Sequence, residues 1–121
     1  MEFKPKILVV DDEPSLLRLL KDLLSEMGAE PSLMASSLQA AELINQEKFD
    51  GAIVDWVMPE MDGLELIQVI RKSRSNKKIP VVMLTSVMEA GALQKAFKAG
   101  ANFFLQKPVS VAQLRHLLNA T

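Results

Sequence analysis

The chain has 121 residues, the length of one compact domain, and its 49% hydrophobic content excludes the disorder typical of weakly apolar, highly charged chains. Its 14 basic and 15 acidic residues leave a net charge of -1, so no overall field attracts nucleic acid or an anionic membrane. The lack of cysteine excludes disulfides and thiolate metal sites, and no apolar run approaches the ~20 residues that span a bilayer. The N-terminal MEFKPK also lacks the apolar segment of a signal peptide. We therefore expect one cytoplasmic domain over residues 1–121, which binds neither nucleic acid nor membrane.

Strand-like and helix-like patterns alternate along the chain. The predicted strands are short runs rich in β-branched or other apolar residues, at 6–10, 30–36, 51–55, 80–85 and 102–106. Each is followed by apolar residues at helical spacing, and these stripes should face the core: Leu16, Leu20, Leu23 and Met27; Leu38, Ala41 and Ile44; Leu64, Ile67 and Ile70; Ala90, Leu93, Ala96 and Phe97; Val111, Leu114 and Leu118. The second helix should cover SLQAAELINQEK, residues 37–48. Gly28 and Gly100 supply stops for the first and fourth helices.

Five β-then-α units in a small domain predict an α/β fold, with a mostly parallel sheet covered by helices on both faces. The apolar runs ILVV, AIV and VVML fit strands that are buried on both sides. Pro31 favours an edge position for the second strand. The basic stretch RKSRSNKK, residues 71–78, is too short for a domain boundary. Periodicity leaves the strand order open.

Polar residues follow four of the apolar runs directly. They are Asp11, Asp12 and Glu13 after the first strand, Asp55 after the third, Thr85 after the fourth and Lys107 after the fifth. Ligands of open parallel α/β sheets bind at the carboxyl ends of the strands, so these residues are candidates for one shared site.

Each of these residues alone has an ordinary explanation. One acid before Pro14 can cap a helix, Thr85 can be a strand-end hydroxyl, and Lys107 can be a solvated charge. These ordinary explanations do not account for the acids as a group, because two carboxylates ~5 Å apart repel by roughly 3 kcal/mol at an effective dielectric constant near 20. Asp11, Asp12 and Asp55 would face one lysine. Mg²⁺, which takes carboxylate oxygens and keeps other positions for water or phosphate, resolves this conflict.

Four motifs that cover essentially the whole chain, VVDDEP, DWVMPEMDG, MLTS and FFLQKP, resemble the receiver domain of bacterial two-component response regulators. The resemblance implies a doubly wound, flavodoxin-like sheet of strand order 2-1-3-4-5. It also implies that Asp55 accepts a phosphoryl group from a histidine kinase or phosphotransfer protein. The switched surface would then control an output domain or partner protein, with the domain assisting its own phosphorylation rather than acting as an enzyme on a separate substrate.

The same resemblance implies roles for single residues. Asp12, Asp55 and the backbone carbonyl of Val57 would ligate Mg²⁺, and Asp11 would act largely through water. Lys107 would pair with a phosphoryl oxygen, and Lys107–Pro108 would be a cis peptide. Thr85 and Phe104 would form the switch. A docking face on the fourth helix, fifth strand and fifth helix would include Lys95, Lys98, Gln106 and Arg115.

Other residues near these motifs are assigned simpler roles. We expect Trp56 to be a partly exposed loop aromatic, Met58 and Met61 to pack the loop, and His116 to be exposed. The resemblance to receiver domains also implies that Val57 and Val87 flank the phosphoryl group. Valine cannot orient a water, so we expect slow hydrolysis of the phosphorylated aspartate, although simple packing of both valines remains an alternative.

Two alternative functions remain open. A magnesium phosphohydrolase of the haloacid dehalogenase type would use Asp11 as nucleophile, with Glu13 in place of the usual second aspartate, but it leaves Asp55 unexplained. A receiver-like module that binds partners without phosphorylation would need none of the acids, yet all are present. The first alternative predicts phosphorylation on Asp11, and the second predicts partner binding that Asp55→Asn does not change.

Overall fold

The structure, a computed structural model, describes residues 3–86 and 89–119, in which strands and helices alternate. Their bounds are β1 Lys6–Val10, α1 Pro14–Glu26, β2 Glu30–Met34, α2 Ser37–Ile44, β3 Gly51–Asp55, α3 Gly63–Lys72, β4 Val81–Thr85, α4 Ala92–Ala99, β5 Phe103–Gln106 and α5 Val111–Asn119. The second strand ends at Met34 because the Ser36 side chain caps α2, accepting a hydrogen bond of 3.2 Å from the backbone N–H of Gln39. Gly28 and Gly100, with φ of 85° and 120°, follow α1 and α4 as predicted.

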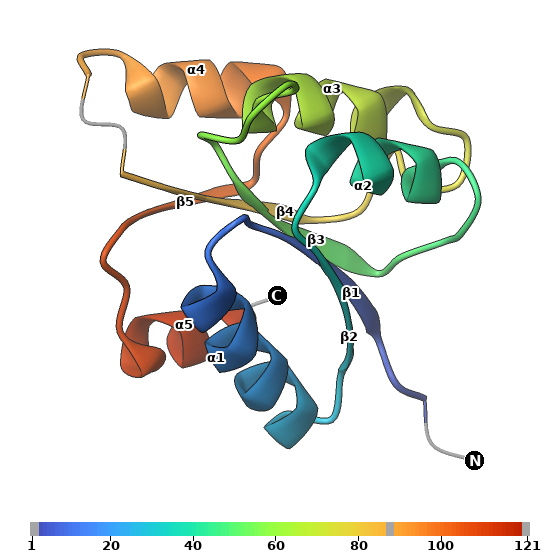
Figure 1. The fold of residues 1–121 in the computed structure, drawn as a ribbon, viewed down its shortest axis with the longest axis vertical. Coiled ribbons are helices and arrows are strands. Elements are labelled where there is room, and N and C mark those ends of the chain that lie inside the picture. The colour runs from blue at the N-terminus through green and yellow to red at the C-terminus, as the bar shows by residue number, and fades with distance from the viewer. Residues whose placement is uncertain (1–2, 87–88, 120–121) are drawn as a thin grey trace.

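The five strands form one parallel sheet in the order β2-β1-β3-β4-β5, which confirms the predicted fold. Figure 1 shows α1 and α5 on one face of this sheet and α2, α3 and α4 on the other. β2 is an edge strand, as its proline predicted. β1 lies beside β3 with Val10 opposite Val54, so the residues that follow these two strands meet at one edge of the sheet.

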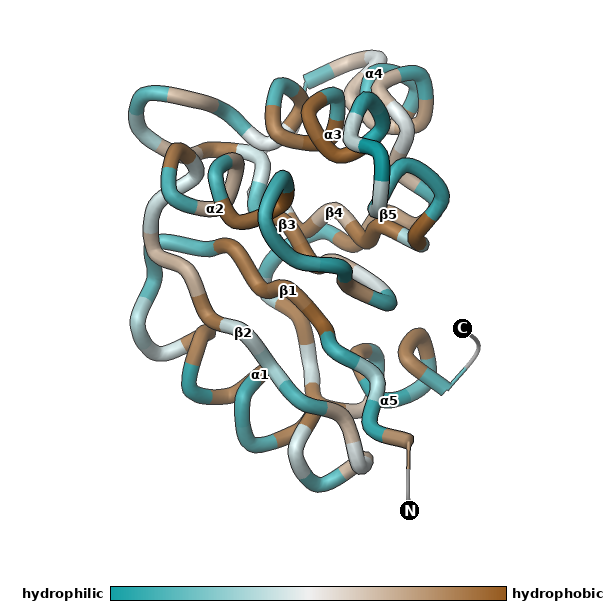
Figure 2. The backbone as a smooth tube through the Cα atoms, turned by 90° about the vertical axis from the view of Figure 1, so that its right-hand side faces the viewer, coloured by the Kyte–Doolittle hydropathy of each residue, from teal (hydrophilic) through white to brown (hydrophobic). Residues whose placement is uncertain are grey.

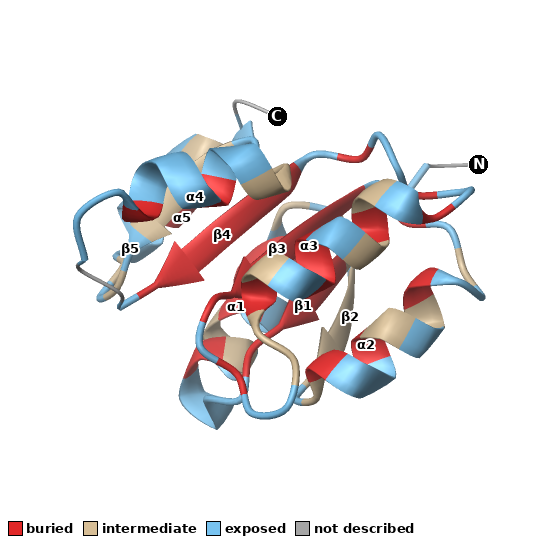
Figure 3. Ribbon diagram, turned by 90° about the horizontal axis from the view of Figure 1, so that it is seen from above, coloured by how far each residue is buried: buried red, intermediate tan, exposed pale blue. Residues whose placement is uncertain are grey.

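Alternate residues of the central strands supply two separate cores. Leu8, Val54 and Met83 face the cluster formed with α2, α3 and α4, whereas Val9 and Ile53 face the cluster formed with α1 and α5. All five residues of β3 and of β4 are buried, as the red strands in Figure 3 show. The hydrophobic stretches of the backbone in Figure 2 run through the same strands. Burial on both faces explains their continuous apolar sequence.

Two predictions about helices were wrong. α2 ends at Ile44 rather than at residue 48, because carbonyls near its end bind the distant Asn76 side chain, which donates to Ile44 O and Glu47 O at 2.8 Å. Several residues of the predicted apolar stripes are exposed rather than buried in the core: Leu38, Leu93, Phe97 and Val111. In α4 the small residues Ala92 and Ala96 face the core instead, since they allow the helix to approach the sheet closely.

Candidate functional site

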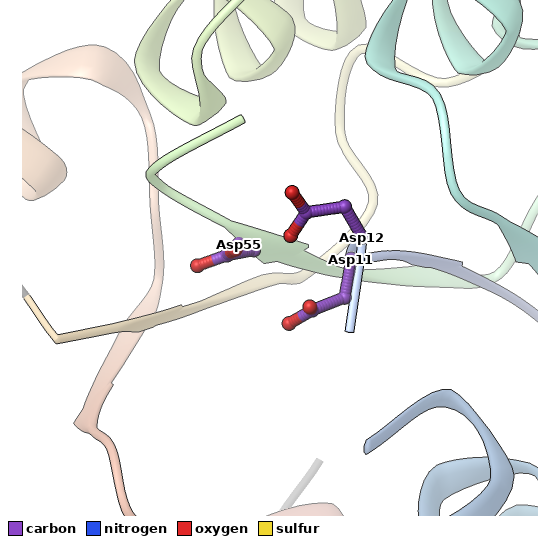
Figure 4. Close-up of side chains that lie close together, drawn as sticks. All are labelled: Asp11, Asp12 and Asp55. Carbon is purple, nitrogen blue, oxygen red and sulfur yellow. The ribbon is translucent and has the colours of Figure 1, made fainter. Parts of the chain in front are cut away.

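Three aspartates meet where β1 and β3 end. Asp11 and Asp12 follow β1 and Asp55 is the last residue of β3; carboxylate oxygens of all three lie within 4.8 Å of one another (Figure 4). Asp11 is 1% exposed and Asp55 5% exposed, whereas Asp12 is exposed to solvent. The structure therefore brings together the three acids that the sequence placed in one site.

Lys107 reaches this cluster from the segment after β5. Its Nζ donates to Asp11 Oδ2 at 2.8 Å and lies 3.5 Å from both Asp55 Oδ1 and Glu13 Oε2. The backbone N–H of Lys107 donates to the carbonyl of Thr85 at 2.8 Å, which ties the lysine to the end of β4. The Lys107–Pro108 peptide is cis, as predicted. Lys107 is thus the central cation of a site that holds three carboxylates within ion-pair distance of it.

Burial and the neighbouring charges shift the pKa values of Asp55 and Lys107. Burial and the neighbouring Asp11 raise the pKa of Asp55 from 3.8 to about 6, although Lys107 opposes the shift. Burial alone would lower the pKa of Lys107, but its hydrogen bond to Asp11 and the surrounding carboxylates raise it above its usual value. The lysine stays charged, and the carboxylates remain in excess of positive charge. A donor set of this kind, with oxygen ligands from neighbouring carboxylates, fits a hard divalent cation.

Trp56, expected to be partly exposed, is 7% exposed and belongs to the larger hydrophobic cluster together with Met58. The reason lies in Gly63, at the start of α3. Gly63 donates its backbone N–H to Trp56 O at 2.7 Å, and a Cβ at Gly63 would lie 2.8 Å from Trp56 Cα and would collide with Asp55 O. Only glycine lets α3 begin against the backbone at the end of β3, and its position in MPEMDG, at the end of a turn-rich segment, is the signal in the sequence.

The predicted switch residues lie on β4, which pairs with β3, and on β5, the edge strand that pairs with β4. Thr85 is fully buried at the end of β4. Phe104 on β5 is partly buried and lies opposite Met83, at the wall of a hollow of about 240 Å³ that extends under the start of α4. Val57 is 57% exposed beside Asp55, and Val87 lies outside the described residues. His116 is exposed and Met61 is partly buried, as expected.

Comparison with known proteins agrees with this arrangement. The sequence pattern of the response regulator receiver domain matches residues 7–119. The chain belongs to this family. The receiver domain is 34% identical over 115 residues to the chemotaxis protein CheY-3 of Vibrio cholerae, covering 94% of this chain and 88% of that protein. It is 35% identical to CheY1 of Helicobacter pylori over 93% of both chains.

Solved structures extend the likeness to three dimensions. The receiver domain superimposes on CheY4 of Vibrio cholerae with a TM-score of 0.91 and 29% identity, covering 98% of each chain. It also superimposes on the receiver domain of the Pseudomonas aeruginosa sensor histidine kinase PA1611 with a TM-score of 0.86 and 26% identity, covering 98% and 97% of the two chains. That structure holds a magnesium ion coordinated in its active site cleft. Within the described residues of the present chain, none of the helices has the length and hydropathy of a membrane span.

The raised pKa of Asp55 predicts a pH-dependent effect on stability. Asp55→Asn should raise the free energy of unfolding of the metal-free protein by on the order of 3 kcal/mol at about pH 8. The folded state binds the proton of Asp55 more tightly than the unfolded state does, so the ionised carboxylate destabilises the fold above about pH 6. The gain should shrink as the pH falls through about 6 and vanish below about 4.

Urea unfolding in the presence of a chelator measures this gain at each pH. Asp22→Asn, in an exposed position on α1, removes the same charge and serves as the control. If both variants gained the same free energy of unfolding at every pH, the surroundings of Asp55 would not destabilise its ionised carboxylate.

Proposed function

We propose that the receiver domain accepts a phosphoryl group on Asp55 from a phosphohistidine of a histidine kinase or phosphotransfer protein, in the cytoplasm, and controls an output domain or partner protein with the resulting change of surface. Residues 1–121 would form the phosphoacceptor domain. The observation that supports the proposal most strongly is the buried Asp55 carboxylate, which two further carboxylates and one ammonium group surround. The relatives named above include chemotaxis proteins and the receiver domain of a sensor histidine kinase.

The chain's own residues account for the transfer step. An Asp55 oxygen attacks phosphorus, the bond from phosphorus to the donor's histidine nitrogen breaks, and that nitrogen keeps the electron pair and takes a proton. Lys107, 3.5 Å from Asp55 Oδ1, is near enough to meet a phosphoryl oxygen. Asp11 holds the lysine in place through its 2.8 Å hydrogen bond. Positioning and charge compensation, rather than further covalent chemistry, drive such transfers.

Asp12, Asp55 and the backbone carbonyl of Val57 would hold Mg²⁺, with Asp11 acting largely through water. When bound, the ion would offset the negative charge of the carboxylates and of the incoming phosphoryl oxygens. Asp12 is suited to this role because it is exposed, whereas Asp11 is buried and engaged by Lys107 and by the backbone N–H of Glu13 at 2.9 Å.

The change of surface would begin at Thr85. Its hydroxyl would hydrogen-bond the phosphoryl group, and Phe104 would then turn inward toward the hollow at the start of α4. Such a change selects between two existing states, because the phosphoryl group acts through its different affinity for each. The exposed Leu93 and Phe97 of α4, 44% and 45% exposed, lie within the docking face expected for a partner.

The polar residues of the expected docking face differ in exposure and in ion pairing. Lys98 and Gln106 are exposed, and Lys95 is exposed but pairs with Glu89 at 3.0 Å. Arg115 pairs instead with Glu26 of α1 at 3.4 Å. We therefore assign the apolar residues of α4, rather than Arg115, the larger share of partner contact.

Acetyl phosphate with Mg²⁺ tests the proposal directly. We expect mass spectrometry to find one phosphoryl group, on Asp55, and none in Asp55→Asn or without the metal. Trp56 fluorescence should follow the reaction, because the indole directly follows the acceptor and is buried beside it. Modification of Asp11 instead would favour the phosphohydrolase alternative, and partner binding unchanged by Asp55→Asn would favour the module that acts without phosphorylation.

The lifetime of the phosphorylated state provides a further prediction. Val57→Asn should speed hydrolysis by about tenfold, because an amide near the phosphoryl group can orient an attacking water whereas valine cannot. Decay of the phosphorylated protein after removal of acetyl phosphate gives the rate. Val57→Ala shortens the side chain without adding a polar group and is the control; identical rates for the Asn and Ala variants would mean that Val57 does not govern hydrolysis.

A further inference from the structure

A basic pocket lies at the opposite end of the sheet from the aspartates. It measures about 460 Å³ and is formed by the connection from α2 to β3 and the connection from α3 to β4, which lie at the right of Figure 1. Four cationic side chains line it: Lys48, Arg74, Lys77 and Lys78. Asp50 is the one carboxylate among the lining residues, and its Oδ2 accepts a hydrogen bond from the backbone N–H of Lys6 at 2.8 Å.

The backbone under these cations is fixed by buried hydrogen bonds. Asn76, fully buried, accepts from the backbone N–H of Phe49 at 2.7 Å and so joins the two connections that form the pocket. Arg71 donates to the carbonyls of Lys77 and Ile79 at 3.0 and 2.6 Å. Binding at this pocket would therefore order side chains but little backbone, which lowers the entropic cost of association.

The four cations have no partner of opposite charge within the described part of the chain. They are all exposed, and none of the ion pairs formed by described residues includes them. In contrast, Lys6, Lys95, Lys107 and Arg115 each pair with a carboxylate. The chain as a whole carries a net charge of -1, so this pocket is a local concentration of uncompensated positive charge.

We propose that this basic pocket binds an acidic segment of a partner protein, rich in Asp and Glu, and that it does so independently of phosphorylation. The pocket adjoins the start of β3 at Gly51, whereas Asp55 ends the same strand, so the two sites are separated along its full length. The acids around Asp55 would repel the same segment and orient its approach toward the basic end. The site would tether a partner whether or not the acceptor is occupied.

Nucleic acid suits the pocket less well. Single strands bind to exposed aromatic side chains that stack on bases, and the aromatic residue of this pocket, Phe49, is fully buried. A duplex needs a broad basic surface, whereas the cations here surround a hollow and the domain is acidic at its other end. Lysine ammonium groups act as compact point charges, which suits carboxylates at several spacings.

Fluorescence anisotropy with a labelled oligoglutamate peptide of about ten residues tests the proposal. At about 20 mM salt the wild-type protein should bind the peptide, and binding should weaken steeply toward about 200 mM. Lys77→Glu with Lys78→Glu should weaken binding by at least about tenfold. The control pair Arg18→Glu with Lys21→Glu makes the same change in net charge at exposed positions on α1 and should weaken binding by less than about twofold.

Circular dichroism and urea unfolding show whether each variant is folded. A milder pair, Arg74→Gln with Lys48→Gln, should also weaken binding of the peptide. Equal weakening by the pocket and control pairs, or no binding at low salt, would overturn the proposal. Tighter binding of a short DNA duplex through the same lysines would overturn it in favour of nucleic acid. None of these results depends on whether Asp55 is the phosphoacceptor.

Discussion

Replacing Lys107 with methionine is expected to slow phosphorylation of Asp55 by acetyl phosphate by about 100-fold or more, the usual cost of removing one charged donor from a developing anion. The ammonium group lies 3.5 Å from Asp55 Oδ1 and is held there by Asp11 at 2.8 Å. Methionine is an unbranched side chain only one atom shorter than lysine, but it supplies no positive charge to a phosphoryl oxygen. The rate of phosphoryl incorporation, measured by mass spectrometry or Trp56 fluorescence, gives the effect.

The same substitution should act in the opposite direction on metal binding. Removing a cation next to Asp11 and Asp55 increases the negative charge available to Mg²⁺, so affinity for the ion should rise while transfer falls. A variant that was only misfolded would lose both properties. Lys98→Met, in an exposed position on α4, is the matched control and should change neither. A fall in transfer of less than about tenfold would assign the charge compensation to groups other than Lys107.

The site could be predicted from the sequence because its residues directly follow strands. In a parallel sheet the carboxyl ends of neighbouring strands lie at one edge, so Asp11, Asp12, Asp55, Thr85 and Lys107 were placed together before their distances were known. Apolar runs without alternation identified the strands, because burial on both faces removes the polar positions. The order of the strands came from the resemblance, since periodicity carries no information about neighbours.

Predictions failed where a distant residue decides the outcome. Trp56 is buried because Gly63 lets α3 begin against the backbone at the end of β3, and the turn-rich sequence around Gly63 does not say how closely the two approach. Leu93 and Phe97 have helical spacing, yet the alanine that precedes each of them is buried instead. α2 ends early because Asn76, 32 residues after Ile44, binds the carbonyl of that residue, and a helix that continued would need the same carbonyl.

Asn76→Ala is therefore expected to lower the free energy of unfolding by about 3 kcal/mol or more. The asparagine is fully buried; it donates to the carbonyls of Ile44 and Glu47 at 2.8 Å and accepts from the N–H of Phe49 at 2.7 Å. Alanine leaves these backbone groups without their partner, and each buried group that stays unsatisfied costs ~1–3 kcal/mol. Against a total stability of about 5–15 kcal/mol, this loss should be large in a urea unfolding curve.

Asn45→Ala is the matched control, because Asn45 is exposed and makes one side-chain hydrogen bond, of 3.3 Å, to Ala41 O. It should lower stability by less than about 1 kcal/mol. Similar losses in the two variants would mean that water replaces Asn76 at the carbonyls it now binds. Asn76 bridges the segments that precede β3 and β4, whereas Asp55 and Lys107 lie at the opposite end of the sheet. The Asn76→Ala variant should therefore be phosphorylated at the wild-type rate under conditions where it remains folded. Loss of stability with unchanged transfer, the reverse of the pattern expected for Lys107→Met, would separate the residues that hold the sheet together from those that carry the chemistry.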